Sequence, residues 1–133
     1  MLTRRFLNGA VVAVALAGAG LLAPAKADTT VPFSEQAFKA AQAAGSPILV
    51  EIHAGWCPTC KAQKPIIDKL ATDAKFKNLK IFRVDFDAMK PEVVRFGAKM
   101  QSTLIVFKGS TELGRSVGDT KDTSIAALLD KSL

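Results

Sequence analysis

Two cysteines separated by two residues are the side chains of this chain best suited to chemistry. They lie in the segment Trp56-Cys57-Pro58-Thr59-Cys60, and the 133-residue sequence contains no other cysteine. Thiols at this spacing can close a small disulfide ring, which removes little loop entropy and so adds little stability. If the segment opens a helix, the positive end of the helix dipole favours the leading thiolate. The spacing therefore predicts thiol–disulfide exchange.

Metal binding is the alternative use of the same thiols. Cys57 and Cys60 could hold a soft ion such as Cu(I) or zinc, with His53, the only histidine, as a third ligand. A closed structural zinc site needs four ligands, and two cysteines in one chain fall short of that set. The sequence favours an enzyme over a metal-binding module or copper metallochaperone.

Residues 1–27 have the pattern of a secretory signal peptide. A basic start containing Arg4 and Arg5 precedes an uncharged apolar run, and Ala25-Lys26-Ala27 offers small residues for cleavage before Asp28. The apolar run is marginal for a membrane span, which needs ~20 residues, so an uncleaved anchor is the less favoured alternative. We expect a periplasmic or otherwise extracytoplasmic protein. The sequence is compatible with export by either the Sec or the twin-arginine route.

The remaining residues, 28–133, have the length of one small domain. Fifteen of the 18 basic residues and all 12 acidic residues fall in this region, so its net charge is +3. The lysines are scattered, which is typical of a solvated surface and does not indicate a nucleic-acid site. We expect a monomer that needs no cofactor.

Hydrophobic periodicity predicts helices and strands in alternation along this domain. Helices are expected at 34–44, 58–74, 91–96 and around 125–129, and strands at 48–53, 79–86, 103–107 and 112–117. The apolar stripe of the second helix is assigned to Ala62, Ile66, Ile67, Leu70 and Ala71. This order predicts an α/β fold with a mixed sheet and helices on both faces.

The domain resembles the thioredoxin family over essentially its whole length. The resemblance is carried by residues 48–51, 54–61, Pro65, 84–87, 96–97, 103–109 and Gly118. A CxxC motif alone is weak evidence, but here Trp56 precedes it, a buried strand leads into it and a proline-containing helix follows. The resemblance implies a thioredoxin-like fold.

The resemblance also implies roles for individual residues. Cys57 matches the attacking thiol, which is exposed in the family, and Cys60 matches the resolving thiol. Glu51 matches a buried acid that exchanges protons with the resolving thiol, and burial in an apolar strand would raise its pKa toward neutrality. The alternative is that Glu51 reaches solvent at the sheet end or pairs with a lysine. Arg83 matches a lysine near that acid and could pair with it.

Other residues near the cysteines are candidates for tuning or substrate contact. Trp56 could shield the thiols or simply pack, and Pro58 and Thr59 lie between them. His53 could stabilise a thiolate or move a proton, although replacement of a packing aromatic is the favoured interpretation. Thr59 offers only a hydroxyl, where strongly oxidising relatives often have a histidine, so the couple is expected to be reducing.

Ser102, followed by Thr103, departs from the family pattern, which has a cis-proline at position 102. A cis bond before serine would cost ~2.5–4 kcal/mol, so the Gln101–Ser102 peptide should be trans. This serine could alter the substrate groove, ease metal capture, donate a hydrogen bond to the Cys57 sulfur, or change nothing.

The partners expected from the resemblance are proteins. The substrates would be protein disulfides or thiols. An exported reductant also needs a membrane-bound redox partner, because an oxidising compartment does not restore its thiols.

Overall fold

The computed structural model describes residues 29–133. The segment predicted to be a signal peptide, and the cleavage site predicted before Asp28, lie outside the described residues. Within the described part, no helix has the length and apolar character needed to cross a membrane.

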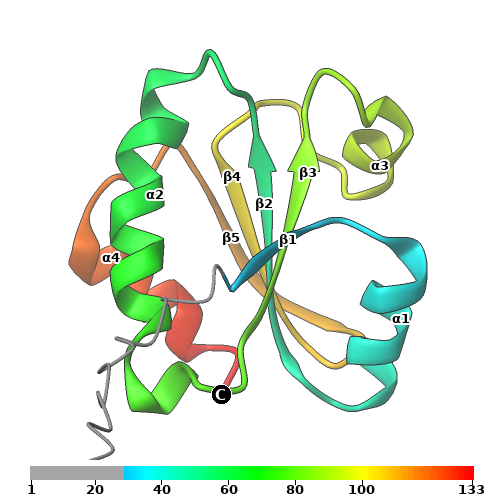
Figure 1. The fold of residues 1–133 in the computed structure, drawn as a ribbon, viewed down its shortest axis with the longest axis vertical. Helices are drawn as coiled ribbons and strands as arrows, with labels where there is room; N and C mark the ends of the chain where they lie inside the picture. Colours follow the sequence, from blue (N-terminus) through cyan, green and yellow to red (C-terminus); the bar gives the residue numbers. More distant parts are fainter. Residues whose placement is uncertain (1–28) are drawn as a thin grey trace, which may run out of the picture.

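A five-stranded mixed sheet forms the centre of the domain (Figure 1). Its strands are β1 (Thr30–Pro32), β2 (Pro47–His53), β3 (Lys80–Asp85), β4 (Thr103–Lys108) and β5 (Thr111–Val117). The spatial order is β1-β3-β2-β4-β5, with β1, β3 and β2 parallel to one another and β4 and β5 antiparallel to their neighbours. Strand β2 is central and almost wholly buried, which explains its continuous apolar run.

Helices cover both faces of the sheet, as predicted (Figure 1). Helices α1 (Glu35–Ala43) and α3 (Lys90–Arg95) lie on one face, and α2 (Pro58–Ala71) and α4 (Asp122–Asp130) lie on the other. A short 3-10 helix, η1 (Ala74–Phe76), follows α2. The fold is the thioredoxin fold.

Alternation along the strands divides the core into two clusters. Ile48, Val50 and Ile52 point toward α1 and α3, where Phe38 and Phe96 pack edge-to-face. The intervening residues of β2 point the other way. Leu49 packs with the apolar sides of α2 and α4, and Glu51 and His53 follow it on that same face of the strand. Two polar side chains thus lie beneath the end of α2 that carries the cysteines.

The structure differs from the sequence-based assignment in three places. Strand β1 was not predicted, because three residues that include Pro32 are too short to show alternation. Helix α2 ends at Ala71, not at Ala74, because η1 begins a separate turn. Ala62 is exposed, whereas Gln63 beside it is buried. A glutamine therefore occupies the inner face of α2 next to the cysteines.

Candidate active site

Cys57 is the N-cap residue of α2, at the end of the loop that follows β2. Its backbone is extended, and its sulfur accepts a hydrogen bond of 3.1 Å from the backbone N–H of Cys60. Pro58 takes the first helical position, where a missing N–H costs nothing. Thr59 is half-buried between the two cysteines. The motif thus forms a cysteine-capped helix start.

Both cysteines are free thiols and both are buried. Cys57 is 1% exposed and Cys60 is 2% exposed, and they cluster with Ala54 and Phe86. The expectation of an exposed Cys57 is therefore wrong for this conformation. The reason is local, because the Cys57 side chain turns inward to cap the helix. A substrate sulfur can reach Cys57 only if the Cys57 side chain moves, or if the residues packed against it, Ala54 and Phe86, move.

The pKa of Cys60 is raised from its ordinary value. Burial is the main cause, and the hydrogen bond with Cys57 adds to it. The backbones of Ala54 and Ser102 act in the opposite direction. Cys60 is therefore held as a thiol that needs help to lose its proton.

Trp56 lies on the surface beside the cysteines and is 59% exposed. Its indole N–H donates a hydrogen bond of 2.7 Å to the Asp87 carboxylate, which comes from the loop between β3 and α3. Asp87 is not recognisable from the sequence as the partner of Trp56, because 31 residues separate the two. The bond fixes the orientation of the indole next to Cys57 in the chain.

Removing the Asp87 acceptor should loosen the indole. Trp56 is the only tryptophan, so its fluorescence reports on this bond alone. We expect Asp87→Ala to lower the fluorescence anisotropy of Trp56 and to cost about 1 kcal/mol of stability. Asp130→Ala, at α4, is the matched control. Equal anisotropy in the two variants would show that the bond does not hold the ring.

Glu51 and Arg83 form an ion pair beneath the sheet end that carries the cysteines. The Glu51 carboxylate, in a residue only 5% exposed, accepts a hydrogen bond from Nε of Arg83 at 3.1 Å, and Nη2 of Arg83 lies 3.0 Å from the same oxygen. The two residues are paired in register on β2 and β3. Burial raises the pKa of Glu51 above its ordinary value, and the Arg83 guanidinium lowers it by less. The result is a carboxyl group whose pKa lies above its ordinary value although it is paired with a guanidinium.

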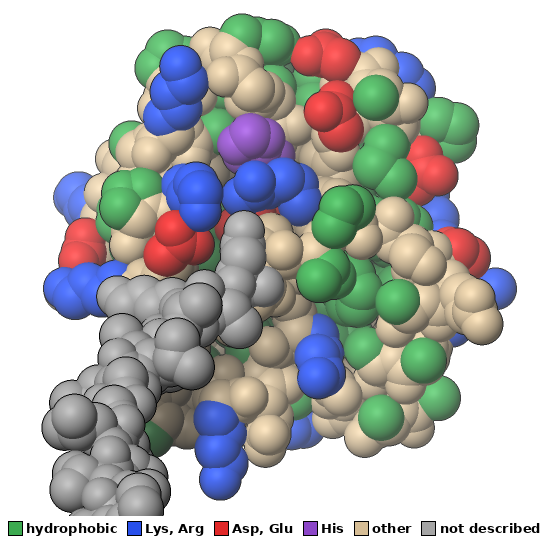
Figure 2. Space-filling view, in the orientation of Figure 1, with side chains coloured by type: hydrophobic (Ala, Val, Ile, Leu, Met, Phe, Trp, Pro, Cys, Tyr) green, Lys and Arg blue, Asp and Glu red, His purple; other side chains and the backbone are tan. Residues whose placement is uncertain are grey.

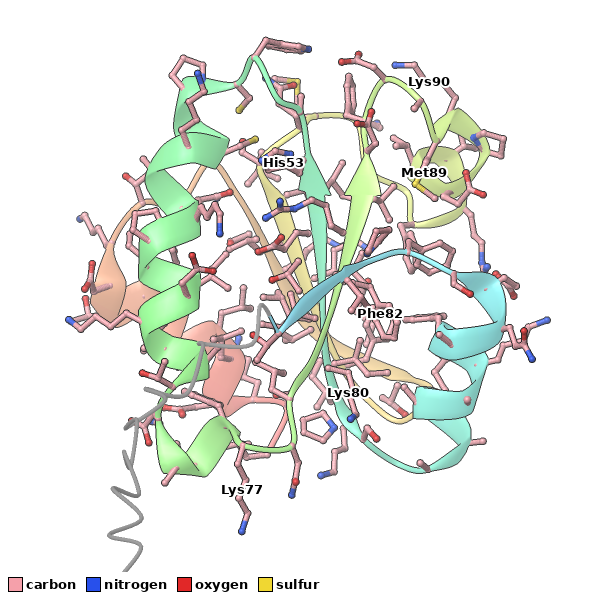
Figure 3. The ribbon with its side chains drawn as sticks, viewed as in Figure 1. His53, Lys77, Lys80, Phe82, Met89 and Lys90 are labelled. Carbon is pink, nitrogen blue, oxygen red and sulfur yellow. The ribbon has the colours of Figure 1, made fainter. Side chains whose placement is uncertain are left out.

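His53 lies two residues beyond Glu51 on the same face of β2, opposite Asp85 (Figure 3). Figure 2 shows this histidine at the surface, next to basic side chains. Burial, and then the positive charge of Arg83, lower the pKa of His53, while Asp85 raises it. His53 is therefore neutral at pH 7. Among residues 29–133, no group of three or more His, Cys, Asp or Glu is placed to hold a metal ion.

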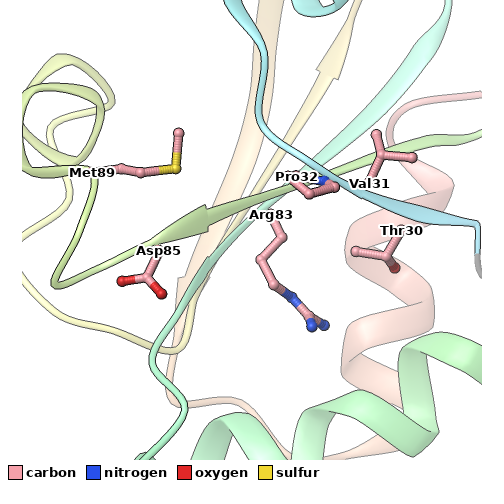
Figure 4. Close-up of a pocket in the computed structure, with 6 residues that line it drawn as sticks. All are labelled: Thr30, Val31, Pro32, Arg83, Asp85 and Met89. Atoms are coloured by element: carbon pink, nitrogen blue, oxygen red, sulfur yellow. The ribbon is translucent and has the colours of Figure 1, made fainter.

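A surface pocket of about 340 Å³ opens beside Arg83 (Figure 4). Its lining comes from β1, β3 and the start of α3: Thr30, Val31, Pro32, Arg83, Asp85 and Met89. It lies at the edge of the sheet formed by β1 and β3, and neither cysteine lines it. Arg83 thus links this pocket to the buried Glu51 carboxylate.

Ser102 is buried at the start of β4, and its preceding peptide is trans, as predicted, since no peptide in residues 29–133 is cis. The Ser102 N–H donates to the Ile52 carbonyl at 2.7 Å, a bond that proline could not make. Thr103 is also buried, and its hydroxyl donates to the Met100 carbonyl at 2.7 Å. The Cys57 sulfur takes its hydrogen bond from Cys60, not from the Ser102 hydroxyl.

A mixed sheet between two helical layers, with a CxxC motif capping a helix, defines the class of thioredoxin-fold thiol–disulfide oxidoreductases. The family model described as Thioredoxin matches residues 29–131, and the chain belongs to the thioredoxin family.

Individual relatives agree with this assignment. A thioredoxin of Pseudomonas aeruginosa is 30% identical over 105 residues, which cover 79% of this chain and 93% of that protein. Thioredoxin C-2 of Corynebacterium nephridii is 30% identical over 90 residues, covering 68% and 82%. The crystal structure of Trxlp from Edwardsiella tarda superposes with a TM-score of 0.74 at 37% identity, covering 75% of this chain and 97% of that one.

Proposed function

We propose that this protein is an exported thiol–disulfide oxidoreductase that reduces disulfides in other proteins. The observation that carries the proposal is the Cys57–Cys60 pair at the first turn of α2, where the Cys57 sulfur accepts a hydrogen bond from the backbone N–H of Cys60. The relatives that are called thioredoxins support the same chemistry.

The reaction proceeds by two exchanges of sulfur partners. The Cys57 thiolate attacks one sulfur of a substrate disulfide, which forms a mixed disulfide and releases the other substrate sulfur as a thiolate. Cys60 then loses its proton and attacks the Cys57 sulfur, which releases the second substrate thiolate. The substrate gains two electrons and the protein becomes a Cys57–Cys60 disulfide. Each released thiolate takes up a proton.

Glu51 is the proposed proton acceptor for Cys60. A base must have a pKa close to the working pH, and burial raises the pKa of this carboxyl in that direction. Arg83 keeps the ionised form accessible by pairing with it. The partly exposed Arg83 and His53 give this end of the sheet a connection to solvent.

Substrate contact is assigned to the apolar side chains around the cysteines. Trp56 lies beside the motif, and the exposed Met100 and Val117 border the Ser102 loop. The surface they form would meet an unfolded or exposed segment of a protein substrate. Reducing direction, export and a membrane-bound electron donor complete the proposal, based on Thr59 and on the pattern of residues 1–27.

Trapping of a mixed disulfide tests the proposal. Without Cys60 the second exchange cannot occur, so Cys60→Ala should accumulate substrates bound to Cys57 that a reductant releases. Ser46→Ala, far from the motif, is a control that should accumulate none. The function is contradicted if Cys60→Ala captures no disulfide-containing protein. The proteins offered to it should include model substrates whose disulfides have been reduced and then allowed to reform.

The reduction potential of the couple tests the direction separately. We expect the Cys57–Cys60 disulfide to equilibrate near thioredoxin, at about −270 mV, and not near the strong oxidant DsbA, at about −120 mV. A reduction potential close to that of DsbA would reverse the proposed direction of electron transfer. It would leave the thiol–disulfide exchange chemistry unchanged.

A further inference from the structure

Gln63 is a buried polar side chain on the inner face of α2, where an apolar residue would be expected. It is 4% exposed and lies three residues after Cys60, so both face the same way on adjacent turns. Its side-chain Nε2 donates two hydrogen bonds, to the Ser102 carbonyl at 3.1 Å and to the Asp119 carbonyl at 2.9 Å. One amide group thus joins α2 to two loops.

Ser102 has an unusual backbone conformation at this junction. It is the one non-glycine residue in 29–133 with a positive φ, at 59°, a conformation that costs on the order of 1–3 kcal/mol and persists only when surrounding contacts hold it. Its N–H donates to Ile52, and its carbonyl accepts from Gly118 at 3.0 Å as well as from Gln63. The Ser102 backbone is therefore fixed from β2, from α2 and from the turn after β5.

The fixed loop meets the resolving thiol. The Ser102 backbone, whose N–H donates to the Ile52 carbonyl, also lies near enough to the Cys60 sulfur to lower the pKa of that thiol slightly, as the Ala54 backbone does. A shift of the loop would weaken that stabilisation while leaving Cys60 buried. Gln63 donates a hydrogen bond to the carbonyl of Ser102 and so fixes the position of the Ser102 backbone. Its effect on Cys60 is therefore indirect, through Ser102.

We infer that Gln63 is a positioning residue for thiol–disulfide exchange, because its amide holds the Ser102 loop against α2 beside Cys60. The catalytic part of this inference rests on the proposed function. Without the two donated hydrogen bonds, the buried Ser102 carbonyl and the half-buried Asp119 carbonyl would lose this partner. The loop would then relax from the positive φ, and the second exchange, in which Cys60 attacks, would slow.

The Gln63→Leu variant removes both donors and keeps the volume. In a Cys57→Ser background only Cys60 titrates, and we expect its thiolate absorbance to rise at higher pH than in the parent, because the Ser102 backbone no longer favours the anion. In the two-cysteine protein, resolution of a preformed mixed disulfide should slow about tenfold, since a displacement of about 1 Å can cost on the order of 100-fold.

Two further variants keep the test decisive. Gln63→Met has a flexible side chain of similar length and replaces Gln63→Leu if that protein does not fold. Gln36→Leu, on the exposed side of α1, is the matched control and should titrate and resolve as the parent does. A Gln63 variant that loses stability but keeps the parent titration and resolution rate makes Gln63 a purely structural residue and overturns the inference.

The titration also separates this inference from the proposed function. It needs no protein substrate, so a parent protein that reduces no disulfide would refute the function while the Cys60 shift still stood. A titration midpoint that stays unchanged or falls in the Gln63 variants overturns the positioning role, whatever the activity of the parent.

Discussion

Replacing Cys57 with serine is expected to reduce disulfide turnover to the uncatalysed background, a loss on the order of 1,000-fold or more. The serine hydroxyl can cap α2 as the thiol does, so the fold should persist. It cannot form the mixed disulfide on which the whole reaction depends. The loss should appear in the single-turnover rate, measured as reduction of a model disulfide protein by an excess of the pre-reduced enzyme.

The Cys60→Ser variant is the matched control for this prediction. It retains Cys57 and should still attack a substrate once, in a single burst that stops at the mixed disulfide. If Cys57→Ser gave that burst and Cys60→Ser did not, the assigned roles of the two thiols would be reversed.

Replacing Glu51 with leucine should stabilise the protein at neutral pH while slowing its chemistry. The Glu51 side chain is almost fully buried, and replacing a buried ion pair by apolar packing is often stabilising by about 1–4 kcal/mol, provided that the remaining partner is not left buried and unpaired. Arg83, which is partly exposed, can turn toward solvent when its partner is removed. Urea unfolding at pH 7 should show the gain as a higher midpoint.

The stability gained in Glu51→Leu should depend on pH, because the pKa of Glu51 differs between the folded and unfolded protein. Burial raises the pKa of folded Glu51 above the ordinary value of 4.5, so the folded protein binds the proton more tightly than the unfolded chain. The contribution of Glu51 to stability is complete below its unfolded pKa and is lost as the pH rises through the raised folded pKa. The advantage of Glu51→Leu should therefore be largest at neutral pH and shrink as the pH falls toward 4.5.

A surface carboxylate is the control for the stability measurement. Glu92→Leu, on α3, should show no comparable gain that depends on pH. For the chemistry, Glu51→Leu should slow the resolving step at pH 7, with the deficit decreasing at higher pH, where Cys60 loses its proton without help. Equal resolving rates in the parent and in Glu51→Leu would exclude Glu51 as the proton acceptor.

The sequence by itself determined the reactive pair, the class of fold and the order of most elements. These features are local. The CxxC spacing spans four residues, and helical or strand periodicity is visible within a single element. Burial of Glu51 could also be predicted, because Val50 and Ile52 flank it in a central apolar strand. Its partner Arg83 could be named only through the family resemblance.

The tertiary structure alone decided how the site is held together. The Trp56–Asp87 bond joins residues 31 positions apart, and the Gln63–Asp119 bond joins residues 56 positions apart. Such contacts depend on which loops the sheet order brings to the same end, and no periodic pattern records that. Strand β1 exists only because β3 offers it an edge.

Contacts between distant segments also explain why the burial of Gln63 and of Cys57 differs from the sequence-based prediction. Gln63 is polar, so the apolar stripe was assigned to its neighbour Ala62, and only the carbonyls of two distant loops make its burial favourable. Cys57 was expected at the surface, but its sulfur turns inward to the N–H of Cys60. Residue types fix what chemistry is available to this chain. Where each sulfur lies, and which backbone groups face it, depends on the packing of α2 against loops far away in the sequence.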